Sequence, residues 1–308
     1  MEDFYLAPGS PKDQSDYMVT ATALGGKVRA LAIRSTNLVK EALRVHGTSP
    51  VATAALGRFL TGALFLADTL KGDGDTMTLN IRSDGPLQGM TVVADSHGHV
   101  RGYCLEPVVE TVYHRPGKLN VGAAVGKGKL TVVKDFGLKE PYVGQVELVS
   151  GEIAEDLTYY LAASEQTPSI VSLGVGLDEN GVTCAGGFMV QLLPGADEET
   201  ISYLEKRVGG GFPEVTFLLQ EGMNPEKILD MFLGDEKICF LQGAPVSYQC
   251  NCSRERMERN LLAIGKKDLT ELSLDPKGID LECHFCDQRY HFSQEDVKAL
   301  ISEDSEES

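Results

Sequence analysis

Four cysteines arranged in two close pairs constrain this chain more than any other feature of its sequence. Cys250 and Cys252 form a Cys-x-Cys pair, and Cys283 and Cys286 form a Cys-x-x-Cys pair. Side chains two residues apart in extended backbone share one face, so the first pair presents both sulfurs together. The second pair does the same across a tight turn. Four thiolates in two pairs match a tetrahedral structural zinc site, so the spacing predicts one Zn²⁺ ion bound by these cysteines.

The residues around the cysteines predict a small zinc-binding domain over 249–301. Ser253 is expected to cap a helix that runs to Ile264. Ser293 with Asp296 matches a capping box for a final helix that ends near Ile301. A segment this short buries little apolar surface, so we expect it to depend on its metal to fold.

The simplest interpretation of this domain is that its zinc ion has only a structural role and holds the end of the chain folded. Two features favour a redox switch instead. A disulfide closed within Cys-x-Cys makes a small strained ring with a comparatively oxidising potential, which is typical of labile bridges. Arg254, Arg256 and Arg259 follow the pair and would favour thiolate once the metal leaves. Oxidation would then expel zinc and unfold the domain.

The charge of the chain restricts its partners. It has 28 Lys and Arg against 45 Asp and Glu, a net charge of −17. Such a charge disfavours binding to nucleic acid by neutralising its backbone and binding to anionic membranes, so we expect protein or small-molecule partners. The N-terminus carries acid where a signal peptide needs base, which predicts a cytoplasmic protein. In a reducing compartment the seven cysteines are expected to be thiols, metal ligands or redox centres.

The most apolar stretch of the chain, residues 54–70, is predicted to be a buried helix. Arg58, Thr61 and Asp68 interrupt it. A membrane-spanning helix needs about 20 predominantly apolar residues, which this stretch does not provide. Ser49 is the expected N-cap of the helix, with Pro50 at its first position.

The remaining pattern predicts an α+β protein with an antiparallel-sheet core domain over 17–195. Short strand-like runs at 17–24, 27–33, 76–82, 87–94, 100–105, 119–125, 130–134, 142–149, 170–177 and 182–193 alternate with turns, and helices are expected at 37–46 and 152–163. A polar extension, 1–16, precedes this domain, and an acidic tail, 302–308, ends the chain. Neither end has an assigned role.

The segment 196–248 differs from the core domain in its predicted elements and in the distribution of its apolar residues. It contains helices expected at 198–208 and from Pro225 to Gly234, with apolar residues in short clusters. Helices this short are marginal alone and must pack on something else. We interpret the segment as a metastable helical linker that folds by docking. The alternative is that it forms an integral part of one continuous domain.

In these motifs the chain resembles the 33 kDa chaperonin family, the redox-regulated bacterial heat-shock chaperones. The resemblance covers most of the chain and is carried by residues 26–30, 160–166, 250–256 and 283–290. The cysteine pattern is its most specific part. Cys104, Cys184 and Cys239 lie outside that pattern, and we expect them to behave as small buried hydrophobes.

The resemblance implies an ATP-independent holdase, not an enzyme, that is inactive while reduced and zinc-bound. It implies that oxidation joins Cys250 with Cys252 and Cys283 with Cys286. Zinc release and linker unfolding would then expose apolar surface that captures unfolding client proteins, with a homodimer as the oxidised form. No nucleic acid and no membrane is implied as a partner.

Enzymatic alternatives have weak support in the sequence. Residues 122–127 resemble a phosphate loop but have one residue too few between the glycines, so a loop-rich hairpin is expected there. His97 and His99 flank a turn glycine and lack an obvious third metal ligand. Cys104 with His114 would need a local group that activates the thiol, and none is apparent.

A zinc-ribbon domain that binds nucleic acid is the main alternative function. Arg254, Arg256, Arg259, Lys266 and Lys267 make a local basic patch. The acidity of the whole chain, its acidic tail and the absence of a compact basic and aromatic run weigh against this alternative.

Overall fold

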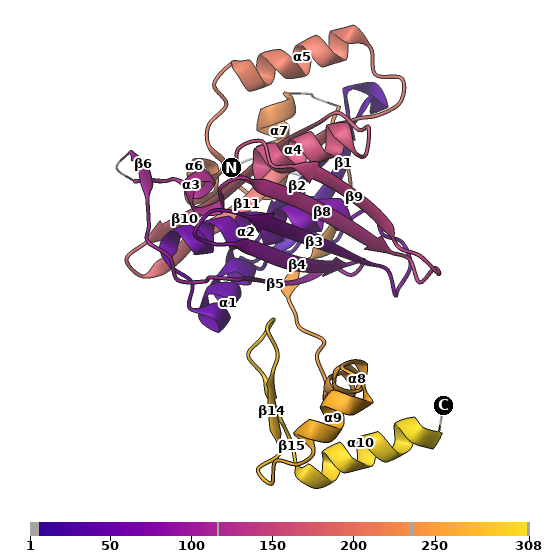
Figure 1. The fold of residues 1–308 in the computed structure, drawn as a ribbon. Coiled ribbons are helices and arrows are strands. Elements are labelled where there is room, and N and C mark those ends of the chain that lie inside the picture. Colours follow the sequence, from indigo (N-terminus) through magenta and orange to yellow (C-terminus); the bar gives the residue numbers. More distant parts are fainter. Residues whose placement is uncertain (1–5, 116, 235–236, 307–308) are drawn as a thin grey trace. The chain divides into compact units, whose positions relative to one another are not determined.

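The structure, a computed structural model, describes residues 6–115, 117–234 and 237–306. The chain divides into two compact units that meet between Gln249 and Cys250. The first unit contains two large antiparallel-type sheets with helices, and the second contains a two-stranded hairpin with helices (Figure 1). The predicted α+β class is therefore confirmed.

Sheet A of the first unit has five strands in the order β10-β11-β2-β1-β12. The strands are β1 (Tyr17–Ala23), β2 (Val28–Arg34), β10 (Ser169–Asp178), β11 (Gly181–Leu192) and β12 (Cys239–Pro245). Strands β1 and β2 form the predicted hairpin, with Ala23 paired to Val28. Their turn spans Leu24–Gly26, where Gly25 and Gly26 have φ of 70° and 82°. Glycine adopts such positive φ without the steric cost that other residues meet.

Sheet B has six strands in the order β13-β5-β4-β3-β8-β9. The strands are β3 (Thr76–Ser83), β4 (Gly89–Asp95), β5 (His99–Cys104), β8 (Gly128–Asp135), β9 (Tyr142–Glu147) and β13 (Ser247–Tyr248). The pairing of β13 with β5 is parallel, and the other pairings are antiparallel. The meander predicted for 76–105 is confirmed as β3, β4 and β5.

The strand predicted at 119–125 is wrong. A short strand β7 (Lys118–Leu119) pairs with β6 (Tyr113–Arg115), and helix α3 (Val121–Val125) follows. The Asn120 side chain caps this helix by accepting a hydrogen bond from the Ala123 backbone N–H at 2.9 Å. An apolar run this short fits either a strand or a buried helix, and here the capping residue decides the outcome.

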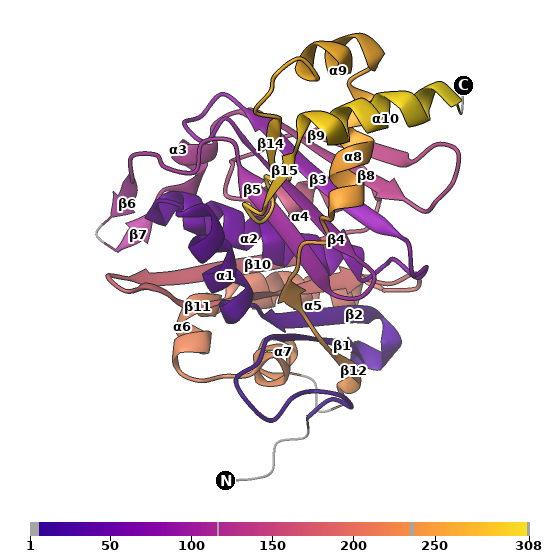
Figure 2. The ribbon, with the colours of Figure 1, turned by 90° about the horizontal axis from the view of Figure 1, so that it is seen from below.

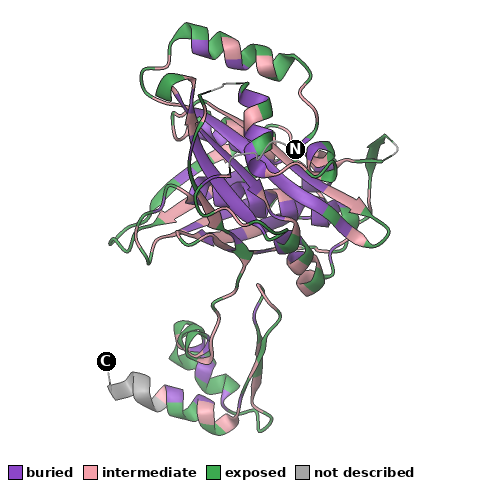
Figure 3. Ribbon diagram, turned by 180° about the vertical axis from the view of Figure 1, so that it is seen from behind, coloured by how far each residue is buried: buried purple, intermediate pink, exposed green. Residues whose placement is uncertain are grey.

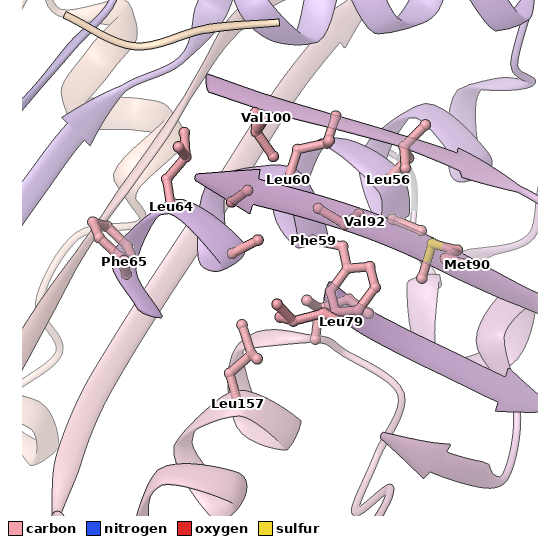
Figure 4. Packing of buried hydrophobic residues seen from close by; sticks show 14 of the residues in the cluster. Leu56, Phe59, Leu60, Leu64, Phe65, Leu79, Met90, Val92, Val100 and Leu157 are labelled. Carbon is pink, nitrogen blue, oxygen red and sulfur yellow. The ribbon is translucent and has the colours of Figure 1, made fainter. Parts of the chain in front are cut away.

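Helix α2 (Pro50–Ala67) lies between the two sheets, with Ser49 at its N-cap as predicted. It contacts β3, β4 and β5 on one side and β10 and β11 on the other (Figure 2). In Figure 4, Phe59 of α2 approaches Leu79, and Val92 lies in the same core. A helix that is apolar on all sides is buried in this way.

By length and composition alone, α2 could cross a membrane, but 89% of it is buried inside the first unit. Its small residues allow this close packing. A side chain added at Gly57 would collide with Val39, and one added at Gly62 would collide with Leu157. Val39 belongs to α1 (Thr36–His46), and Leu157 belongs to α4 (Ala154–Ala163). The buried helix predicted within 54–70 is thereby observed.

The helices of the predicted linker, 196–248, pack on the outer face of sheet A within the first unit (Figure 2), and its last residues form β12 of sheet A and β13 of sheet B, two strands that were not predicted. Its helices are α5 (Glu198–Gly209), α6 (Val215–Gln220) and α7 (Pro225–Leu233), of which only α6 was not predicted. Phe232 of α7 packs on Phe188 of β11 with ring centroids 4.6 Å apart. Both a docked linker and an integral layer of the domain require such packing, so the separate stability of the segment stays a prediction.

The described part of the predicted polar extension, 6–16, packs on the first unit. Ala7 and Asp16 are buried. The Gly243 backbone N–H donates to the Pro8 carbonyl at 2.7 Å, and the Leu38 N–H donates to Asp16 Oδ2 at 2.7 Å. Burial raises the pKa of Asp16. Residues 1–5 of this extension lie outside the described residues.

The second unit contains the predicted zinc-binding domain. Its elements are α8 (Arg254–Ala263), α9 (Lys266–Leu272), β14 (Ile279–Glu282), β15 (Arg289–Phe292) and α10 (Gln294–Glu306). Met257, Leu261, Leu269, Phe292 and Val297 form a small core with Cys283 and Leu300. Figure 3 shows how few residues of this unit are fully buried compared with the first. Helix α10 extends through most of the predicted acidic tail, of which 307–308 are outside the described residues.

Candidate metal centre

The β14–β15 hairpin positions one pair of cysteines. Cys283 follows β14, and the chain turns at once, with the backbone N–H groups of Cys286 and Asp287 donating to the Cys283 carbonyl at 3.2 and 2.8 Å. Asp287 adopts a positive φ of 56°, a conformation that Asp tolerates better than most residues. This tight turn brings the sulfurs of Cys283 and Cys286 to one side of the hairpin.

The other pair lies in the extended segment before α8. Ser253 caps α8 as predicted, because its side chain accepts a hydrogen bond from the Arg256 N–H at 3.3 Å. The cap fixes the backbone immediately after Cys252. At the other end of the unit, the predicted capping box is also observed: Asp296 N–H donates to Ser293 Oγ at 3.2 Å, and Ser293 N–H donates to Asp296 Oδ2 at 2.8 Å.

The structure brings all four predicted cysteines together. The sulfurs of Cys250, Cys252, Cys283 and Cys286 lie within 4.8 Å of one another. Sγ of Cys250 is 3.7 Å from Sγ of Cys283, and Sγ of Cys252 is 3.4 Å from Sγ of Cys286. Zn–S bonds of about 2.3 Å place tetrahedral sulfurs about 3.8 Å apart. The donor set and its spacing therefore fit a tetrahedral Zn²⁺ site.

The protonation of these thiols is set by burial and by their proximity. Burial raises the pKa of Cys250 to about 11 and also raises the pKa of Cys286. Burial acts in the same direction at Cys252, but hydrogen bonds from Tyr290 and the neighbouring thiols outweigh it and lower its pKa. Four thiolates this close repel one another, so a bound cation is needed to hold them together in the charged form.

Tyr290 and Arg254 support the site, and sequence reasoning did not identify the role of either. The Tyr290 hydroxyl lies 3.1 Å from Sγ of Cys252. Arg254 donates to the His291 carbonyl at 2.8 Å, pairs with Asp296 at 3.0 Å and stacks over the Phe292 ring at 4.3 Å. Arg254 was expected to favour thiolate, but its described contacts join α8 to β15 and α10 instead. No motif of this sequence signals these long-range contacts.

The three cysteines outside the motif differ in their burial. Cys104 and Cys184 are buried, as predicted, and burial raises the pKa of Cys104 to about 12. Burial also raises the pKa of Cys184. Cys239 at the start of β12 is exposed, so the expectation that it is a small buried hydrophobe is wrong. It lies at the first position of an edge strand, where side chains reach solvent.

The residues considered for enzymatic chemistry belong to a helix or pair with acidic side chains. Residues 122–125 belong to α3, so the hairpin expected at 122–127 is wrong. His99 pairs with Asp95 at 3.1 Å, and His114 lies 3.3 Å from Glu152. Among the residues that the structure describes, the four cysteines are the one group whose atoms are placed to hold a metal ion.

Comparisons with known proteins show which chains are similar to this one. The family model described as "Hsp33 protein" matches residues 16–293. A 33 kDa chaperonin of Ruminiclostridium cellulolyticum is 51% identical over 94% of this chain and 98% of its own length. One of Lachnoclostridium phytofermentans is 50% identical over 94% of this chain and 99% of its own length.

A solved structure is also similar. The crystal structure of the 33 kDa chaperonin, or heat shock protein 33 homolog, of Thermotoga maritima superposes with a TM-score of 0.85. The two are 37% identical, and the match covers 96% of this chain and 100% of that chain. The sequence match, the shared fold and the cysteine pattern lead to one conclusion: the chain belongs to the Hsp33 family.

Proposed function

We propose that this chain is a redox-regulated, ATP-independent holdase that binds unfolding proteins under oxidative and heat stress in the cytoplasm. Membership of the Hsp33 family and the names of the relatives support a chaperone function. The observation that carries the redox part is the cluster of four cysteine sulfurs within 4.8 Å in a unit with a small core. The activity proposed is binding of clients, not catalysis.

In the reduced form, Cys250, Cys252, Cys283 and Cys286 are proposed to hold one Zn²⁺ ion. When bound, the ion supplies the positive charge that keeps four thiolates together and the cross-link that folds 250–301. Because the core of this unit has few buried side chains, loss of the bound metal should unfold the unit. The reduced form is proposed to be inactive.

Oxidation is proposed to join Cys250 with Cys252 and Cys283 with Cys286. Two molecules of hydrogen peroxide accept four electrons from the four thiolates and four protons from the buffer, and are reduced to four water molecules. Two disulfides remain, and because their sulfurs are poor metal ligands, these four residues would no longer hold a Zn²⁺ ion. The pairing rests on the family resemblance, since the two sulfur contacts at 3.7 and 3.4 Å connect one motif with the other.

Loss of the folded second unit is proposed to release the segment 196–248 from sheet A. The segment covers a face that includes Phe188, Val190 and Ala30. Undocking would expose this apolar surface to clients, and the oxidised form is proposed to be a homodimer. Helices this short are marginal when isolated, so those of the segment are expected to lose their structure once they leave the sheet.

The experiment that tests this mechanism measures zinc release and client binding together. Purified reduced protein is treated with increasing hydrogen peroxide, and free Zn²⁺ is followed with a chromophoric chelator while suppression of client aggregation is recorded. We expect about one zinc per chain to be released, in step with the rise in activity. A Cys239→Ser variant should behave like wild type. Activation with the metal retained would contradict the mechanism, and peptide mapping of the oxidised chain reports the disulfide pairing.

A further inference from the structure

The backbone before α4 contains a strained turn. Ile153 has a φ of 64° and a ψ of −56°, a conformation that a β-branched residue rarely adopts. The Ala154 N–H donates to the Glu152 carbonyl at 2.7 Å, which closes a three-residue turn around Ile153. Turns of this type are rare and strained. Backbone strain is concentrated at functional sites, so the side chains that this turn positions are candidates for a function.

A buried carboxylate holds the turn in place. Asp156 is 1% exposed. Its two oxygens accept hydrogen bonds from four backbone N–H groups, those of residues 149, 150, 151 and 153, at 2.7–3.3 Å. These bonds determine the course of the chain through Glu152 and thereby fix where its side chain starts.

The side chain of Glu152 joins three other elements. Its carboxylate binds Arg58 of α2 at 2.8 Å, accepts a hydrogen bond from the Gly122 N–H at 3.0 Å and lies 3.3 Å from Nε2 of His114. Burial acts to raise the pKa of Glu152, but the Gly122 N–H and the Arg58 guanidinium outweigh burial and lower it. Glu152 is therefore charged, and it orients Arg58.

Arg58 has a second edge that faces away from Glu152. Only 17% of its side chain is exposed. Its Nη1 binds Glu152, while its Nε is buried and has no hydrogen-bond partner among the residues that the structure describes. Nε and Nη2 form the side of the planar group that matches two oxygens of a carboxylate or a phosphate. A buried donor without a partner costs free energy, so an occupant with such oxygens would be favoured here.

The Arg58–Glu152 pair lines a cavity of about 1060 Å³. Small-molecule sites have volumes of roughly 300–1,000 Å³, so the cavity has room for a small organic molecule. Val171 and Leu173 of β10 and Val215 of α6 supply apolar parts of its wall. Apolar walls with a few convergent polar groups are typical of sites that bind such molecules.

The charge of the cavity lining suits an anion. The described lining contains three Lys or Arg, three Glu and one His, whereas the whole chain has 28 Lys and Arg against 45 Asp and Glu. Two of these acids, Glu152 and Glu214, are paired with Arg58 and Lys118 at 2.8 and 3.1 Å. An anion is therefore repelled less here than over the rest of this acidic molecule.

We propose that this cavity, which we name the Arg58 site, binds a small organic molecule that carries a carboxylate or a phosphate group. Nε and Nη2 of Arg58 donate to the oxygens of this group, and the apolar part of the molecule lies against Val171 and Leu173. Glu152 is a positioning residue, because it orients Arg58. The inference goes beyond the proposed chaperone function, since the ligand is a small molecule and its binding requires no redox step.

Matched small ligands test the chemistry of the Arg58 site. Benzoate and phenyl phosphate carry an oxyanion, and benzamide and benzyl alcohol are neutral molecules of similar shape. In isothermal titration of the reduced, zinc-loaded full-length chain, at least one anion should bind about tenfold more tightly than its neutral counterpart. Tighter binding of benzoate would assign a carboxylate ligand, and tighter binding of phenyl phosphate would assign a phosphate ligand. Equal binding of anions and neutral molecules, or no binding of either anion at about 10 mM, would overturn the proposal.

Two variants test whether the anion binds at Arg58. Arg58→Lys keeps a positive charge beside Glu152 but removes the planar fork of donors, so the anion should bind about tenfold more weakly. Ser172→Asp adds a carboxylate to the lining from β10 and should weaken anion binding to a similar extent by repulsion. Because S172D retains Arg58, it tests the proposal even if R58K fails to fold.

The control for these variants is Arg29→Lys. Arg29 is another arginine of low exposure, paired with Asp68, and it does not belong to the described lining of this cavity. R29K should bind the anion as wild type does. Anion affinity that is the same in wild type, R58K and S172D would place the binding elsewhere and overturn the proposal. All of these titrations use the reduced chain without a client, so their failure is distinct from a failure of the chaperone proposal.

Discussion

Among single residues, the cluster of four cysteines was predictable and the contacts of its neighbours were not. The spacing of Cys250, Cys252, Cys283 and Cys286 predicts that their sulfurs come together, because the backbone geometry of both motifs is local. Tyr290 and Arg254 act through contacts that the fold creates, such as the 4.3 Å stacking of Arg254 over Phe292. The same holds for Cys239, whose exposure depends on the edge position of β12.

Tyr290 provides a prediction at this scale. Tyr290→Phe removes the hydroxyl that lies 3.1 Å from Sγ of Cys252 and leaves the ring in place. Hydrogen bonds to metal ligands tune affinity, and their loss typically weakens metal binding by about tenfold or more. We therefore expect Y290F to bind zinc about tenfold more weakly in competition with a chromophoric chelator.

The control for this variant is Tyr142→Phe. Tyr142 is an exposed tyrosine of β9 in the first unit, whereas the four clustered cysteines belong to the second unit. Zinc affinity of Y142F should equal that of wild type. If Y290F also binds zinc as wild type does, the hydroxyl does not support the site.

At the scale of elements, long periodic segments were predicted well and short ones were not. The β1–β2 hairpin, the 76–105 meander, α2, α5, α7, α8 and α10 all follow from patterning and capping residues. The short helices α3, α6 and α9 have five to seven residues, too few for a helical period to be distinguished from a strand. Their conformation depends on packing, as α6 against Gly174 illustrates.

The contact of α7 with β1 gives a prediction about the linker. Glu226 of α7 is fully buried and accepts hydrogen bonds from the Tyr17 hydroxyl at 2.7 Å and the Ala7 N–H at 3.2 Å. Glu226→Ala would leave both donors buried without partners, at a cost of about 2–3 kcal/mol. We expect faster hydrogen exchange over 225–233 and client binding at lower peroxide concentration.

The matched control for this variant is Glu221→Ala, at the exposed end of α6. It removes the same carboxylate from the same segment without leaving a buried group unpaired, so it should match wild type in both measurements. Exchange over 225–233 that is the same in E226A and E221A would mean that the buried carboxylate does not stabilise docking.

In the whole molecule, a continuous backbone joins the two compact units, and the proposed switch requires this connection. The last strand of the first unit, β13, ends at Tyr248, and the first proposed ligand is Cys250. Tyr248 is anchored in the first unit, where its hydroxyl donates to the Gly102 carbonyl at 3.0 Å and lies 2.9 Å from His46 Nε2. Unfolding of 250–301 would therefore begin two residues beyond the anchored end of the segment proposed to undock.

The most direct test of this account compares reduced and peroxide-treated protein as suppressors of aggregation of a heat-denatured client, without ATP. Light scattering at equal chain concentrations measures the suppression. We expect the oxidised protein to keep the client soluble and the reduced, zinc-loaded protein not to do so. Equal suppression by the two forms would contradict the redox switch.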